Sequence, residues 1–299
     1  MLPVVPRPVV RHISSRYIAG PGLEDATTTV RKLNARGKLA TVDVLGEEIT
    51  EVGETDTFAA AYEEVLAEID RRHLDSNISV KPTALGLMLD FDLCRRHFQQ
   101  LVHRARVRDN FVRIDMEDAT TTDAALELYR QLRDAGFDTV GVVLQASLKR
   151  TISDIGDLAD LRPNVRICKG IYVESPEIQF REFRTVQQSF VNALEALFDS
   201  GCYVGIATHD EWLVAQARRI VAERGLGRGE YEFQMLLGVK PSLGDALVAE
   251  GHRLRIYVPF GAQWYEYSLR RLQENPSIAG YIASDTLGRV LNPTRNGLP

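Results

Sequence analysis

Two adjacent arginines near the end of the chain, Arg270 and Arg271, form the pair whose spacing most clearly suggests chemistry. They lie in 257–276, YVPFGAQWYEYSLRRLQENP, where a proline and a glycine end an alternating run before a segment with helical spacing. On a helix the two arginines share a face with Tyr267 and Glu274. Such a face is often only solvated, but two neighbouring guanidinium groups also fit a carboxylate or a phosphate.

Polar side chains also stand where apolar, β-branched runs end further upstream. The residues at these run ends are Lys81, then Asp115, Met116, Glu117 and Asp118, then Gln145, then Arg166 and Lys169 before Gly170, then Thr208, His209 and Asp210, and lastly Gln234 and Tyr257. Each alone has an ordinary explanation, such as helix capping, but burying many unpaired charges is costly. Together they indicate a polar ligand. Since lysines and arginines outnumber the possible metal ligands, an anionic guest is favoured over a metal ion.

A repeated pattern of strands and helices positions these residues. Short β-rich runs cover 39–45, 78–81, 111–117, 140–145, 165–172, 203–209, 231–237 and 254–259, and helical segments cover 55–73, 93–108, 122–135, about 154–161, 176–200, 211–224, 242–250 and 263–274. Strand-then-helix units in series predict parallel pairing with right-handed crossovers. The α/β fold we expect is therefore a (β/α)8 barrel. An open doubly wound sheet is the alternative, but no GxGxxG follows the first run.

The barrel prediction also divides the chain and locates the site. We expect residues 1–37 to form a leader with one helix, 23–35, packed on a single catalytic barrel of residues 38–299. Active sites of such barrels lie at the carboxyl ends of the strands. Arg270 and Arg271 can join the other polar residues only if the last helix lies across the barrel mouth, which would distort the regular ring of helices.

Composition excludes several classes of protein. The 299 residues carry a net charge of −5 with both signs interspersed, which argues against a nucleic-acid-binding surface or a basic membrane patch. Three widely spaced cysteines without a CxxC pair argue against a disulfide framework or a zinc site and favour a reducing cytoplasm. The amino-terminal stretch is interrupted by prolines and arginines, unlike a secretory signal, and no apolar run is long enough to span a bilayer.

The motifs, taken together, resemble those of the flavin-linked proline dehydrogenases. The matching segments are IDMED at 114–118, VLQA at 143–146, RICKG at 166–170, ATHD at 207–210, FQMLLG at 233–238 and the closing stretch 257–276. The part between Tyr257 and Tyr267 is two residues shorter than in the bifunctional relatives, so the resemblance is to the monofunctional bacterial branch.

This resemblance implies an oxidoreductase acting on a CH–NH bond. L-proline would be oxidised to Δ1-pyrroline-5-carboxylate by hydride transfer to N5 of FAD, with electrons passed to a membrane quinone, as the first step of proline catabolism. It implies Lys81, Tyr257, Tyr267, Arg270, Arg271 and Glu274 as substrate-binding residues, Asp115, Arg166 and Lys81 as catalytic residues with Asp115 beside Lys81, and Met116, Gln145, Arg166, Lys169, Gly170, Ile171, Thr208, His209 and Gln234 as FAD-binding residues.

Other functions stay open on the residues alone. Lys81 and Lys169 at strand ends are also compatible with a Schiff-base lyase or aldolase, and a cationic mouth is compatible with a non-catalytic anion-binding barrel. The implied quinone acceptor leaves room for a cytoplasmic protein that associates peripherally with the inner face of the membrane, and for a homo-oligomer.

Overall fold

The computed structural model of the chain describes residues 16–46 and 49–265, which form a closed barrel. Its strands are β1 (Leu39–Val44), β2 (Ser76–Val80), β3 (Val112–Ile114), β4 (Val140–Gln145), β5 (Asn164–Cys168), β6 (Tyr203–Ala207), β7 (Tyr231–Leu236) and β8 (Leu254–Phe260). Each strand pairs in parallel with the next in chain order, and β8 pairs with β1 to close the ring. The predicted (β/α)8 barrel is confirmed.

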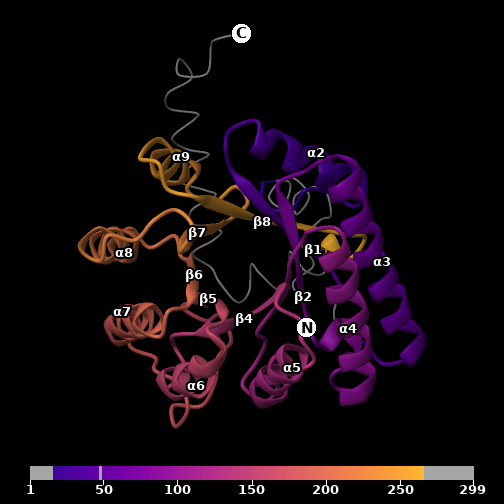
Figure 1. Cartoon of the computed structure of the whole chain (residues 1–299), viewed down its shortest axis with the longest axis horizontal. Coiled ribbons are helices and arrows are strands. Elements are labelled where there is room, and N and C mark those ends of the chain that lie inside the picture. The colour runs from indigo at the N-terminus through magenta and orange to yellow at the C-terminus, as the bar shows by residue number, and fades with distance from the viewer. Residues whose placement is uncertain (1–15, 47–48, 266–299) are drawn as a thin grey trace.

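The helices follow one another around the outside of the strands in chain order (Figure 1). They are α2 (Leu23–Asn34), α3 (Val52–Arg71), α4 (Phe91–Val107), α5 (Thr122–Asp134), α6 (Thr151–Leu158), α7 (Phe183–Asp199), α8 (Glu211–Glu223) and α9 (Pro241–Ala249), with 3-10 turns at Thr83–Leu85 and Ala159–Leu161. Helix α2 precedes the first strand and lies against β1 and β8. Within the described residues, no helix has both the length and the apolar character that crossing a bilayer requires.

The two faces of the sheet differ in chemistry because successive side chains of a strand point to opposite faces. The outward residues, such as Val42 and Ile114, are buried in one apolar core shared with the helices. Many of the inward residues are polar: the guanidinium of Arg166 on β5 donates to Ser79 Oγ on β2 across 3.1 Å. Since β2 and β5 are not neighbours, this bond crosses the barrel interior. Barrels of this fold usually fill that interior with branched apolar side chains.

Two predicted element boundaries were wrong. The helix predicted at 176–200 begins only at Phe183, because the Glu182 carboxylate caps it by accepting from the backbone N–H groups of Arg184 and Thr185 at 2.9 and 2.5 Å. The strand predicted at 165–172 ends at Cys168, because Gly170 turns the chain with φ +99°. The other boundaries within the described residues differ by one to three residues or so.

The predicted last helix, 263–274, lies almost entirely outside the described residues, which end at Tyr265. The expectation that it covers the barrel mouth therefore stays a prediction.

Candidate active site

A cavity of about 480 Å³ opens at the carboxyl ends of the strands, on the side where the fold predicts an active site. The predicted site residues that line it are Lys81, Asp115, Met116, Gln145, Arg166, Lys169, Gly170, Ile171, Thr208, His209, Gln234 and Tyr257. These are all the described residues that the resemblance implies for substrate or cofactor. Of the other polar strand-end residues, Glu117 and Asp210 also line the cavity, whereas Asp118 does not and instead accepts hydrogen bonds from Thr120. Tyr267, Arg270, Arg271 and Glu274 lie outside the described residues.

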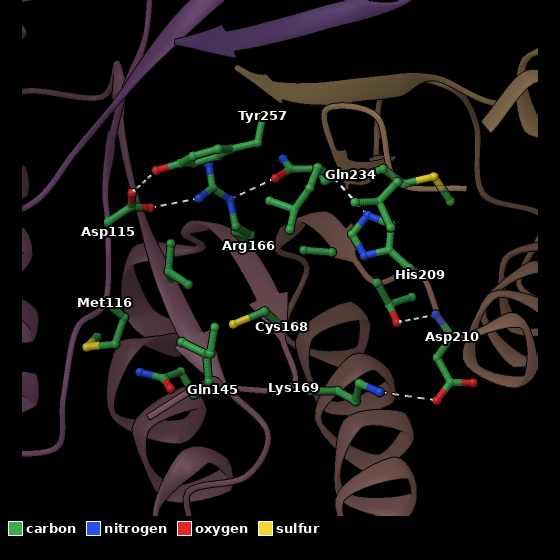
Figure 2. A pocket seen from close by; sticks show the side chains of 18 of the residues that line it. Asp115, Met116, Gln145, Arg166, Cys168, Lys169, His209, Asp210, Gln234 and Tyr257 are labelled. Carbon is green, nitrogen blue, oxygen red and sulfur yellow. Dashed lines mark hydrogen bonds and ion pairs between the residues drawn. The ribbon is translucent and has the colours of Figure 1, made fainter. Parts of the chain in front are cut away.

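Arg166 is the centre of the polar network beside the cavity (Figure 2). Its Nε donates to Gln234 Oε1 at 2.7 Å, and its two terminal nitrogens donate to Asp115 Oδ1 at 2.7 Å and to Ser79 Oγ at 3.1 Å. Tyr257 donates its hydroxyl proton to Asp115 Oδ2 at 3.0 Å, and the guanidinium lies 5.3 Å from the centre of the Tyr257 ring. Both oxygens of Asp115 therefore accept hydrogen bonds, and Arg166 is fixed by three partners, one on β2, one directly after β3 and one on β7.

Lys81 is paired with Asp43, a residue that the sequence reasoning did not single out. Its ammonium donates to both Asp43 carboxylate oxygens, at 2.9 and 3.1 Å, and the Tyr62 hydroxyl donates to Asp43 at 3.0 Å. Asp43 is fully buried, and burial raises its pKa while the charge of Lys81 opposes the rise. Asp43 carries the same signal as the other site residues, since it is an acidic residue near the end of an apolar strand.

The Lys169 end of the cavity combines a cation with a close backbone approach. Lys169 Nζ lies 3.3 Å from Asp210 Oδ2, and its charge lies 5.0 Å from the centre of the Phe183 ring. Gly170 has no room for a side chain, since a Cβ there would lie 2.3 Å from Ser147 Oγ. Gly170 and Lys169 both line the cavity, so a ligand there can contact the backbone next to a positive charge, an arrangement that suits a phosphate.

His209 is held as a neutral imidazole of one tautomer. The backbone N–H of Leu236 donates to His209 Nε2 at 2.8 Å, so Nε2 carries no proton. Burial, together with the nearby Lys240 and Lys169 charges, lowers the pKa of His209 to about 4. At neutral pH its Nδ1–H is therefore a hydrogen-bond donor without a charge.

Gln145 is positioned through the segment after β3. Its Nε2 donates to the backbone oxygen of Glu117 at 2.6 Å, and the Glu117 carboxylate accepts from the Thr83 N–H at 3.0 Å and from the Thr83 hydroxyl. Burial raises the pKa of Glu117, although the Thr83 hydrogen bonds oppose the rise. The segments after β2 and β3 are thereby joined at the rim of the cavity.

The donors around the cavity fit a cofactor that carries phosphates and a hydrogen-bonding ring. The cavity volume lies within the range of about 300–1,000 Å³ typical of ligand pockets. Cations at Arg166 and Lys169, amides at Gln145 and Gln234 and the Gly170 backbone supply directed contacts from three strands, β4, β5 and β7, and from the loop that follows β5. The arrangement can bind and orient an anionic cofactor over a substrate, and it places one buried guanidinium where it can stabilise negative charge.

Comparison with known proteins gives a consistent result. A family model described as proline dehydrogenase matches residues 26–284. The chain is 36% identical over 272 residues to Proline dehydrogenase 1 of Bacillus subtilis (strain 168), covering 91% of this chain and 90% of that protein. It is 33% identical over 283 residues to the proline dehydrogenase of Deinococcus radiodurans, covering 92% and 90%.

A solved structure shares the fold. The crystal structure of proline utilization A (PutA) from Bdellovibrio bacteriovorus inactivated by N-propargylglycine superposes with a TM-score of 0.82 at 20% identity, over 88% of this chain. This chain spans 32% of the length of that protein.

Proposed function

Because this chain belongs to the proline dehydrogenase family, we propose that it oxidises L-proline to Δ1-pyrroline-5-carboxylate with FAD as its cofactor. It is accordingly an oxidoreductase of proline catabolism. The observation that supports the cofactor and site assignment is that all the described residues implied for substrate or cofactor line one cavity. The fold brings strand ends together, but side chains that only cap helices or face solvent need not line a shared cavity.

FAD would be held by Arg166, Lys169, the Gly170 backbone and the amides of Gln145 and Gln234, and when bound it supplies the hydride-accepting chemistry. Arg166 is 7% exposed, so its charge acts with little screening on any anion in the cavity. Lys169 and Gly170 offer the charge and the backbone approach that a pyrophosphate requires.

The substrate end of the cavity would lie near Asp115, Tyr257 and Lys81. The Tyr257 hydroxyl and the Arg166 guanidinium fix both oxygens of Asp115, which orients the carboxylate beside the cavity. Arg270 and Arg271, which lie outside the described residues, would bind the carboxylate of proline as a fork, with Tyr267 and Glu274 completing the pocket.

The two alternatives compatible with the sequence are not favoured. A Schiff-base lyase needs an uncharged lysine amine, but the Lys81 nitrogen donates two hydrogen bonds to a buried carboxylate and the Lys169 nitrogen lies beside Asp210. A barrel that only binds an anion does not explain the family match over residues 26–284.

An anaerobic absorption spectrum tests the proposed function. The purified protein should be yellow, or become so when FAD is added. L-proline should bleach the absorption band of the oxidised flavin. D-proline is the matched control, because it has the same size and charge as the substrate. A colourless protein that FAD cannot reconstitute would contradict the cofactor assignment. A flavin that L-proline does not reduce would contradict the substrate assignment.

The electron acceptor and the location of the protein form a separate part of the proposal. We infer a quinone as acceptor and a cytoplasmic protein that touches the membrane peripherally. Reduction of a soluble quinone analogue by proline tests the first, and co-sedimentation with vesicles that contain quinone tests the second. Turnover with a quinone analogue but no co-sedimentation with vesicles would support the quinone acceptor and contradict the membrane contact.

A further inference from the structure

A buried ion pair lies below the cavity, between Glu232 on β7 and Arg255 on β8. The Arg255 Nε donates to Glu232 Oε1 at 2.6 Å and a terminal nitrogen donates to Oε2 at 3.1 Å. Glu232 is 2% exposed, and neither residue lines the cavity. Burial acts to raise the pKa of Glu232, but the charge and hydrogen bonds of Arg255, the hydrogen bond from Gln234 and the charge of Arg113 together lower it. Glu232 is therefore a buried carboxylate that the proposed function does not use.

Glu232 has a second partner, the side-chain amide of Gln234. Gln234 Nε2 donates to Glu232 Oε1 at 2.6 Å, and Gln234 Oε1 accepts from Arg166 Nε at 2.7 Å. A carboxylate can only accept and a guanidinium can only donate. Only one orientation of the amide satisfies both neighbours, so the side chains themselves determine it.

The Gln234 amide is also confined on its open side. A Cβ placed on Gly205, on the neighbouring strand β6, would lie 2.5 Å from Gln234 Nε2. The glycine leaves room for the amide but little for it to move, so it stays between Glu232 and Arg166.

We propose that Glu232 is a positioning residue for the proline dehydrogenase reaction, acting through Gln234 to aim the Arg166 guanidinium at Asp115 and the cavity. The proposal rests on the proposed function, because it assigns Glu232 a role in flavin binding and turnover through Arg166. Without the Glu232 acceptor, Gln234 Nε2 loses its partner at this position, and the amide can swing away from Arg166 to find another acceptor. Arg166 then loses one of its three partners.

The competing explanation is that Glu232 only neutralises buried cations. Arg255 pairs with it directly, and Arg113 and Arg166 are further guanidinium groups inside the barrel. A purely structural role predicts that removing the ion pair as a unit leaves flavin binding unchanged. A positioning role predicts that flavin binding depends on the hydrogen-bond acceptor at residue 232 and does not change when the salt bridge to Arg255 is altered.

The test compares two variants of the full chain. Glu232→Met/Arg255→Met removes both charges together, so no buried charge loses its partner, but it also removes the Gln234 acceptor. Arg255→Lys keeps a cation and keeps Glu232 facing Gln234. We expect the double variant to weaken FAD binding about tenfold or more and to lower kcat, since one hydrogen bond to a charged group is lost. Arg255→Lys should change FAD affinity less than twofold, even where it lowers thermal stability.

Crystal structures of the flavin-free proteins supply a readout that does not depend on activity. In the double variant the Arg166 guanidinium should be displaced from Asp115, and in Arg255→Lys it should not. If the double variant does not fold, Glu232→Asp tests the same contact, because it keeps the anion and withdraws the acceptor by one methylene. Unchanged FAD affinity and an unmoved Arg166 in the folded variant would overturn the proposal. A wild-type protein that binds no FAD would instead overturn the proposed function, while the position of Arg166 would still decide the role of Glu232.

Discussion

His209 should make the stability of this protein depend on pH in a defined window. Its pKa is lowered from 6.5 to about 4, because the imidazole is buried near Lys240 and Lys169. In the unfolded chain a histidine takes up a proton near pH 6.5. Between pH 6.5 and 4 the unfolded state therefore binds more protons than the folded state, so the free energy of unfolding falls as the pH falls. Above pH 6.5 both states are neutral and His209 contributes nothing.

The size of the effect follows from the shift. One pKa unit corresponds to about 1.4 kcal/mol, so a change from 6.5 to about 4 corresponds to about 3 kcal/mol of stability lost over that window. His209→Gln removes the titration and can still accept the backbone N–H of Leu236 with its side-chain oxygen. Urea unfolding at a series of pH values should therefore show that the free energy of unfolding falls less steeply for His209→Gln than for the wild type between pH 6.5 and 4. The difference over that window should total about 3 kcal/mol.

The control and the refuting result are both specific to this side chain. His103 is exposed on α4, so His103→Gln is the matched control for the same substitution at an exposed position. The remaining ionisable groups are common to all three proteins, so their contributions cancel in the differences. If the His209→Gln and wild-type profiles run parallel from pH 6.5 to 4, the imidazole is not held neutral and the tautomer assignment is wrong.

Three further substitutions test other parts of the site. Asp43→Asn removes the buried carboxylate partner of Lys81 and should lower the free energy of unfolding by about 3–5 kcal/mol, which a thermal melt would show as a Tm decrease of roughly 10 °C. A loss of less than about 1 kcal/mol would mean that the pair does not stabilise the fold. Gly170→Ala places a Cβ 2.3 Å from Ser147 Oγ at φ +99° and should weaken FAD binding. Gly136→Ala is the control, because Gly136 has φ +83° with open space around it. It should lower the free energy of unfolding, measured by chemical denaturation, by only about 1 kcal/mol and leave FAD affinity unchanged. Arg166→Ala should weaken FAD binding or shift the flavin reduction potential more than it raises the KM for proline, and a change confined to KM would contradict its assignment to the flavin.

The sequence predicted which residues meet but not which of them pair. The resemblance implied Asp115 beside Lys81, whereas the structure has Lys81 donating to Asp43 and Asp115 accepting from Arg166 and Tyr257. Lys81, Arg166 and His209 were placed at the mouth because the order of strands and helices brings all strand ends to one side. Their partners depend on the stagger of the strands, which a sequence pattern does not contain, so the pairing of Lys81 with Asp43 appears only in three dimensions. The start of α7 was mispredicted because the helical spacing in the sequence continues upstream of Glu182, while the backbone there follows a loop instead.

Glu232 and Arg255 show a limit of a different kind. Both lie within strands rather than at their ends, so a search for polar strand ends passed over them. Alternation of polar and apolar residues was visible in YEFQML and LRIYVPF, but it is also typical of a strand with one solvated face. Only the closed ring shows that the polar face is an interior one.

The bond between Asp115 and Arg166 joins the first four strands of the barrel to the last four, because Asp115 follows β3 and Arg166 lies in β5. A fragment ending after β4 would keep the carboxylate and lose both Arg166 and Tyr257, while the complementary fragment would bring a guanidinium to its open edge. Neither fragment would contain the partner of the charged side chain that it brings to this contact. Polar side chains that we assign to a ligand thus also make the two halves dependent on each other, so that separately expressed halves should recover a barrel only by assembling with one another.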